Sequence, residues 1–271
     1  MNKVLYGVTL FLYFLASFHY LLYLINQRES IGKVCRITAI AGFAMNTLAM
    51  LHLTFYSGHV PLTNLRESLF FMSWAIMFIY IILEYRMKVI VMGAFIVPLA
   101  FLCMLVSVTL PEPSVIVPAY LSSAWLGVHT SFAFLAYAAF TISFATSVMY
   151  IIQERQLKHK HPGTFYHRLP PIEMLDELAY KGIALGFPLL TLAIVTGAIW
   201  ANSAWGQYWG WEPKEIWALI TWFIYAAYLH MRLVAGWRGR KAAYLAIAGF
   251  GIVMFTFLGI TLLLPGKHAF K

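Results

Sequence analysis

The longest uncharged stretch of the chain, residues 113–153, reads PSVIVPAYLSSAWLGVHTSFAFLAYAAFTISFATSVMYIIQ. A helix that crosses a bilayer needs about 20 mostly apolar residues, so this stretch is more than long enough. Seven further runs without Asp, Glu, Lys or Arg lie at 4–27, 37–65, 68–83, 89–111, 182–211, 216–231 and 242–266. The 271 residues are 62% hydrophobic and 11% charged, a composition typical of an integral membrane protein with no soluble domain.

These runs predict an all-α, polytopic membrane protein with about eight transmembrane helices. The expected helices are 4–25, 36–56, 66–84, 88–109, 120–152, 182–200, 214–235 and 243–264. The fifth is about 50 Å long at about 1.5 Å per residue, whereas the hydrocarbon core is about 30 Å thick. Its first turns therefore stand in the outer interface, and His129 is expected at or just above the outer membrane surface.

Basic residues are distributed unevenly between alternate loops. One set of loops holds 14 of the 19 Lys and Arg residues, and the other set holds Lys3, Arg66, Lys214, Lys267 and Lys271. Because Lys and Arg mark cytoplasmic loops, both termini are predicted on the non-cytoplasmic side. The stretch 153–181 is then a cytoplasmic loop within a single domain, 1–271. The net charge of +9 is spread over loops, which argues against nucleic-acid binding.

Five tryptophans fall within 18 residues on the predicted outer side, in WANSAWGQYWGWEPKEIW at 200–217. An aromatic belt at the membrane interface would explain the tryptophans. It explains poorly why Gly206 and Gly210 alternate with them, since glycines let a flat ligand approach the backbone and the indole faces. We therefore expect the outer loop 201–217 to be a binding platform.

Two helix starts are marked by local sequence. Pro213 suits the first position of a helix, and Glu212 and Glu215 match the positive end of that helix. Asn64 followed by Glu67 has the form of a capping box that opens the third helix.

The run WGQYWGWEPKEIWALITWFIYAAYLHMR at 205–232 resembles the WWD motif and following helix of the CcsA (ResC) family. These are haem-handling membrane proteins of system II cytochrome c biogenesis. Three further passages agree with the family: SGHVPLTNLRESLFFMSW at 57–74, LGVHTSFAFLAYAAF at 126–140 and FLGITLLLPGKHAF at 257–270. Glu212 stands where the family usually has Asp, and Arg66 stands where an aromatic residue is common.

The resemblance implies that haem b is bound by two histidines. It marks His129 and His268 as the external axial ligands and His230 as an intramembrane ligand. Two imidazoles would close the positions at which oxygen binds iron. The platform residues are Trp205, Tyr208, Trp209, Trp211, Glu212, Pro213 and Trp217. The residues that could meet haem propionates as charge-assisted donors are Arg66, Lys214 and Lys267.

A partner for His230 is inferred from depth alone. His230 lies 16 residues into the expected seventh helix and His19 lies 15 residues into the first, so both reach about 23 Å below the outer surface. An ionisable group at such depth is a functional hypothesis by default. We expect His19 to be the second ligand. The other histidines have no assigned role: His52, His59, His159, His161 and His167.

The resemblance implies a protein of the cytoplasmic (inner) or thylakoid-type membrane that moves haem to an external site. There it would present haem to an apocytochrome c with a C-x-x-C-H sequence, acting with a CcsB (ResB)-like partner as part of a haem lyase. The sequence shows no separate catalytic acid, base or nucleophile, so catalysis would consist mainly of positioning two reactants. Two alternatives stay open: a HemX-like regulator of tetrapyrrole synthesis, and a transporter with an intramembrane histidine relay.

Overall fold

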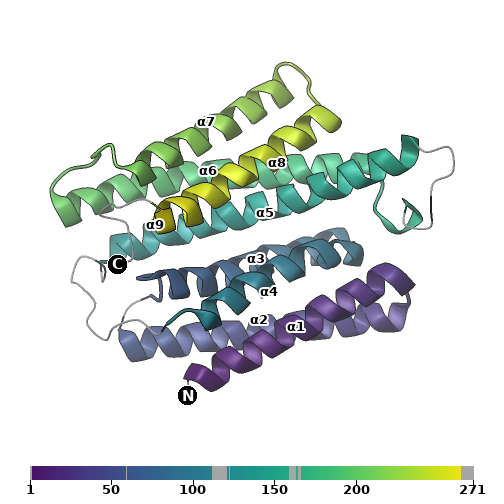
Figure 1. Ribbon diagram of the computed structural model, residues 1–271, viewed down its shortest axis with the longest axis horizontal. Coiled ribbons are helices and arrows are strands. Elements are labelled where there is room, and N and C mark those ends of the chain that lie inside the picture. Colours follow the sequence, from purple (N-terminus) through teal and green to yellow (C-terminus); the bar gives the residue numbers. More distant parts are fainter. Residues whose placement is uncertain are drawn as a thin grey trace. The chain divides into compact units, whose positions relative to one another are not determined.

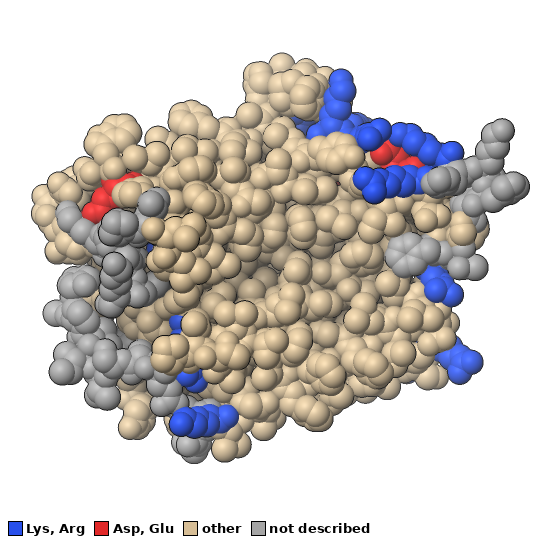
Figure 2. Space-filling model, in the orientation of Figure 1, with Lys and Arg blue, Asp and Glu red and all other residues tan. Residues whose placement is uncertain are grey.

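The computed structural model describes residues 2–58, 60–111, 121, 123–158, 163 and 166–263. Within these ranges the chain is helical, and eight helices are long and apolar enough to cross a membrane. The predicted all-α polytopic fold is confirmed. On the face drawn in Figure 2, charged side chains lie toward the ends of the helices and the wide middle is uncharged.

The first of two compact units comprises Met1–Val117 and Pro162–Pro170. Its helices are α1 (Asn2–Asn26), α2 (Glu29–Ser57), α3 (Leu65–Met87) and, after a short 3₁₀ turn at Ile90–Met92, α4 (Gly93–Thr109). The helices α1 and α2 pack as an antiparallel pair, α3 packs against α4, and α4 also contacts α1 (Figure 1).

The second unit comprises Pro118–His161 and Pro171–Lys271. Its helices are α5 (Ala124–Lys158), α6 (Ile172–Trp205), α7 (Pro213–Leu233) and α8 (Arg240–Met254), which continues through a π-helical segment, Phe255–Gly259, into α9 (Ile260–Leu263). Long α5 and α6 lie side by side; α7 packs against α6, α8 packs against α5 and α6, and α7 and α8 pack against each other (Figure 1).

Several helices extend beyond their predicted ends. The stretch 153–181, predicted as a loop, is helical at both ends, because α5 runs to Lys158 and α6 begins at Ile172. Charged residues in these added turns are paired: Lys158 lies 2.9 Å from Glu154, and Arg232 of α7 donates hydrogen bonds of 3.0 and 2.7 Å to Asp176. Ion pairs allow a helix to continue where hydropathy alone predicts that it ends.

The start of α3 agrees with the predicted capping box in part. The Asn64 side chain accepts a hydrogen bond of 3.0 Å from the Glu67 backbone N–H, as expected for an N-cap. The Glu67 carboxylate reaches one residue further back than predicted, and accepts from the backbone N–H and the hydroxyl of Thr63, each at 2.9 Å.

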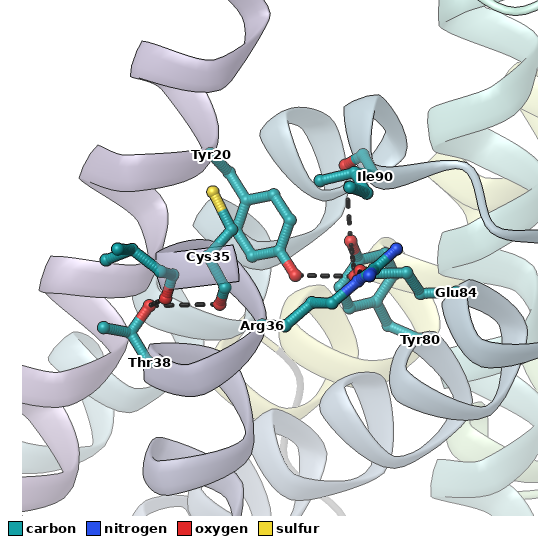
Figure 3. Close-up of polar contacts among 8 residues, drawn as sticks. Tyr20, Cys35, Arg36, Thr38, Tyr80, Glu84 and Ile90 are labelled. Atoms are coloured by element: carbon teal, nitrogen blue, oxygen red, sulfur yellow. Dashed lines mark hydrogen bonds and ion pairs between the residues drawn. The ribbon is translucent and has the colours of Figure 1, made fainter. Parts of the chain in front are cut away.

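A buried carboxylate joins three helices of the first unit (Figure 3). Glu84 of α3 accepts hydrogen bonds from the Tyr80 hydroxyl, from the Tyr20 hydroxyl of α1 at 2.6 Å, and from Arg36 Nε of α2 at 2.9 Å. Gly93 opens α4 against the same group, and a Cβ added there would overlap the Tyr20 ring. All four helices of the unit therefore meet at this point.

We expect Glu84→Ala to destabilise the first unit strongly. Breaking a buried ion pair costs about 3–5 kcal/mol, and the loss should fall toward the lower end because the Arg36 side chain is 47% exposed. Glu29→Ala is the matched control, since the Glu29 carboxylate that pairs with Lys33 is 85% exposed and such pairs contribute about 0–1 kcal/mol. Unfolding of both variants in detergent measures the difference in stability. Equal losses of stability would show that the buried Glu84 carboxylate does not hold the first unit together.

Candidate functional site

The Trp-rich loop is a short connection between α6 and α7. The helix α6 ends at Trp205 because Gly206 adopts a left-handed conformation (φ 74°) and donates its N–H to the Asn202 carbonyl at 2.9 Å. Pro213 is the first residue of α7, as predicted. The non-helical part of the loop is therefore 206–212, shorter than the stretch 201–217 that the sequence suggested.

Two glutamates fix the shape of this loop. The Glu212 side chain accepts from the Glu215 backbone N–H, and the Glu215 carboxylate accepts from the Glu212 N–H at 3.1 Å, which forms a complete capping box. The same Glu215 oxygen accepts from the Gly210 N–H at 2.8 Å. The Glu212 carboxylate therefore serves as the N-cap of α7.

The loop presents aromatic side chains that core packing does not cover. Tyr208 and Trp211 are 60% and 69% exposed. The indole of Trp209 packs edge-on against Trp211, with centroids 5.8 Å apart. Trp211 has a positive φ of 56°, which is uncommon for a bulky residue and is a feature of constrained functional loops. The indole N–H of Trp209 is buried and has no hydrogen-bond partner in the described part of the chain.

His129, in the second turn of α5, is held against α6. Its Nδ1 lies 2.7 Å from the carbonyl oxygen of Ala193. A carbonyl oxygen can only accept, so Nδ1 carries the hydrogen, and in the neutral imidazole Nε2 keeps its lone pair. None of the described residues forms a hydrogen bond with Nε2. Metal-binding histidines commonly donate one ring N–H to a backbone carbonyl in this way.

The His129 ring also packs against an aromatic residue of α6. It lies parallel to the Trp200 indole, with an interplanar angle of 6° and centroids 6.3 Å apart. Trp200 is 3% exposed and its ring meets Trp205 edge-on at 4.9 Å. A line of aromatic contacts therefore connects the His129 imidazole to the end of α6, where the Trp-rich loop begins.

The start of α7 places a cation near this imidazole. Lys214 Nζ lies 3.4 Å from the Thr261 hydroxyl of α9 and is near enough to His129 for the two side chains to interact electrostatically. Trp217, predicted as a platform residue, packs edge-on against Phe255 in the π-helical segment, with centroids 4.5 Å apart. The contact between Trp217 and Phe255 therefore lies within the second unit.

Comparison with known proteins identifies the family. The family described as Cytochrome C assembly protein matches residues 62–268. The chain is 40% identical over 234 residues to the cytochrome c biogenesis protein CcsA of Guillardia theta, an alignment that covers 79% of this chain and 77% of the relative. The chain belongs to the CcsA family of cytochrome c assembly proteins. The CcsA protein of Prochlorococcus marinus (strain MIT 9312) is 39% identical over 279 residues, covering 91% of this chain and 90% of its own.

A solved structure shares the fold of this CcsA-family chain. The structure of the cytochrome c haem lyase CcmF superposes with a TM-score of 0.67 over 96% of the chain, at 18% identity. The chain spans about half the length of CcmF, 48%. With its eight apolar helices and its family, the chain is a multi-pass membrane protein of cytochrome c biogenesis.

Arg66, a predicted propionate donor of this CcsA-family protein, makes a structural contact in the first unit. Its guanidinium donates a hydrogen bond of 2.9 Å to the Leu110 carbonyl and lies 5.2 Å above the Tyr6 ring. The Ser107 hydroxyl donates to the Arg66 carbonyl at 2.8 Å. These bonds tie the start of α3 to the end of α4.

The remaining predicted ligands are distributed over both units. His19 of α1 is partly buried, and its Nδ1 is buried without a hydrogen-bond partner among the described residues. His230 of α7 is exposed. His268, the predicted second external ligand, and Lys267 lie outside the described residues.

Three residues that hold His129 were not predicted from the sequence. Ala193, Gly197 and Trp200 are spaced four and three residues apart, so they share one face of α6. The sequence alone shows that these three residues share a helix face. It does not show that this face contacts His129, because that contact depends on the register of α5 against α6.

Proposed function

We propose that this chain binds haem b through His129 and His268 and presents it to an apocytochrome c for thioether attachment. The observation that carries the proposal is the orientation of the His129 ring. Its Nδ1–H is committed to the Ala193 carbonyl, so Nε2 is the nitrogen that can bind iron. His268 would be the second histidine that holds the iron, on the basis of the family resemblance.

Residues of the Trp-rich loop and of the start of α7 fit a haem group. The buried indole N–H of Trp209 is a donor without a partner among the described residues, and it suits a propionate oxygen. Lys214, whose Nζ lies 3.4 Å from the Thr261 hydroxyl of the same unit, is the cation that would pair with a propionate. The exposed faces of Tyr208 and Trp211 would cover the flat porphyrin.

Bound haem would supply two vinyl groups, to which the cysteine thiols of a C-x-x-C-H sequence add with no leaving group. The role of this chain would then be to fix the position of the reacting carbons and to exclude water. His129 would hold the iron from one side, and the capped loop 206–212 would limit movement of the aromatic residues. Positioning of this kind can lower a bimolecular barrier without a catalytic acid or base.

The proposal also includes a route for haem and a setting for the protein. His19 and His230 would bind haem in transit within the membrane before it reaches the external site. Both termini and the Trp-rich loop would face the non-cytoplasmic side of an inner or thylakoid-type membrane. A CcsB (ResB)-like membrane protein would be the partner.

Covalent haem attachment in a defined host tests the proposed function. The chain is expressed with a CcsB-like protein and an apocytochrome c in cells that lack their own cytochrome c assembly proteins. We expect covalent haem that depends on this chain and on both cysteines of the C-x-x-C-H sequence. A HemX-like regulator would instead change the amount of tetrapyrrole and leave the apocytochrome unmodified.

The aromatic loop gives a separate prediction. Trp209→Ala or Trp211→Ala should lower haem content several-fold, because each removes a flat face from the platform. Trp222→Ala is the control, since Trp222 lies within α7. Its indole N–H donates a hydrogen bond of 2.9 Å to the Thr191 hydroxyl, and its ring packs against Phe187. The haem-to-protein ratio of the purified variants measures the effect. Equal haem loss in all three variants would support an aromatic belt that stabilises the fold and contacts no ligand.

A further inference from the structure

Gly197 of α6 lies directly beneath the imidazole of His129. A Cβ added at this position would lie 2.7 Å from Nδ1 and 2.8 Å from Cε1 of the ring. Real Cβ atoms essentially never approach other atoms this closely, so any side chain at residue 197 must displace the ring. The ring cannot shift without disturbing the 2.7 Å hydrogen bond from Nδ1 to the Ala193 carbonyl.

Three groups on successive turns of α6 define the orientation of the ring. The Ala193 carbonyl accepts the Nδ1 hydrogen, the bare backbone of Gly197 leaves room for the ring, and the Trp200 indole lies parallel to it. Nδ1 and Nε2 are on different sides of an imidazole, so a ring bonded to Ala193 directs Nε2 away from that carbonyl. The protonation of one nitrogen and the direction of the other are thus set together.

We propose that Gly197 is a positioning residue for haem, which keeps the His129 imidazole in its Nδ1–H form with Nε2 directed toward the metal. The inference rests on the proposed function, because it assumes that His129 binds iron. Gly197 itself has no side chain and contacts no ligand. Its effect is exerted through the ring, as partners of metal-binding histidines commonly act.

Gly197→Ala tests this role without weakening the helix, because alanine has a higher helix propensity than glycine. Two matched glycine variants separate positioning from packing. Gly186→Ala, also in α6, would place a Cβ 2.5 Å from the Phe140 ring, away from His129. Gly251→Ala in α8 would meet nothing within 4 Å.

The first measurement uses protein without haem. The ¹⁵N signals of labelled histidine, with His129 assigned by the signal lost in His129→Gln, report which ring nitrogen carries the hydrogen at a pH where imidazoles are neutral. We expect wild-type protein and Gly186→Ala to show hydrogen on Nδ1. In Gly197→Ala the hydrogen should move at least partly to Nε2, because the Ala193 bond is lost.

The second measurement is the absorption spectrum of haem-loaded protein. Loss of a partner that orients a metal-binding histidine costs about 10–100-fold in affinity, so haem retention by Gly197→Ala should fall by at least about tenfold. Added imidazole should restore part of the low-spin spectrum, because it fills the vacated axial position. Gly186→Ala and Gly251→Ala should retain haem.

The outcomes separate the two proposals. A Gly197→Ala protein with hydrogen on Nδ1 and wild-type haem content would overturn the positioning role and leave the proposed function standing. Equal haem losses in Gly197→Ala and Gly186→Ala would also overturn it. A folded wild-type protein that takes up no haem would overturn the proposed function, and the ¹⁵N signals would still decide whether Gly197 orients the ring.

Discussion

His129→Ala is expected to lower both haem content and cytochrome c maturation by at least about tenfold, since loss of a residue that only orients a ligand already costs about 10–100-fold. The substitution removes an imidazole whose Nδ1–H is committed to the Ala193 carbonyl. His268→Ala should have a similar effect. The measurements are the haem-to-protein ratio of purified protein and covalent haem on a co-expressed apocytochrome c.

Added imidazole should partly restore maturation in both variants, because it can occupy the empty axial position. His167→Ala is the control: His167 lies in the short 3₁₀ segment Tyr166–Arg168 and its side chain is exposed. Cytochrome c maturation in the His167→Ala variant should remain at the wild-type level. If His129→Ala and His268→Ala also mature cytochrome c normally, the axial assignment is wrong.

The second large effect is expected from the intramembrane histidines. His19→Ala and His230→Ala should each deplete haem at the His129 site while the amount of folded protein stays normal, because haem would no longer be held in transit. The measurements are haem content and the amount of protein in the membrane.

His52→Ala is the matched control for His19→Ala. His52 is also a partly buried histidine of the first unit with an unbonded Nδ1 among the described residues, and it stacks on Tyr56. It should keep normal haem content. A His19→Ala protein that loses folded protein instead of haem would show that His19 is a packing residue.

The eight spans could be predicted from the sequence because hydrophobic length alone determines them. The ends of a helix could not be predicted where polar contacts extend the helix past its apolar part. The first turns of α6 hold Asp176, which pairs with Arg232 of α7, and hydropathy carries no information about that distant partner. The π-helical segment Phe255–Gly259 likewise interrupts a stretch predicted as one uniform helix.

The candidate site was predictable in its residue types and not in its geometry. Glu212, Pro213 and Glu215 mark a helix start by local rules, and the structure shows that start. The contact of His129 with Ala193 joins residues 64 positions apart and involves a backbone carbonyl, which every residue carries. Its donor and acceptor are paired only by the packing of α5 against α6.

The central claim, that this chain holds haem b between two histidines, is tested most directly by the visible absorption spectrum of the protein purified from a haem-replete host. The account predicts a b-type, low-spin spectrum of two-histidine ligation, which His129→Ala converts to a weaker, high-spin spectrum that imidazole reverses. A folded protein without haem would contradict the claim, and so would a low-spin spectrum that is unchanged in His129→Ala.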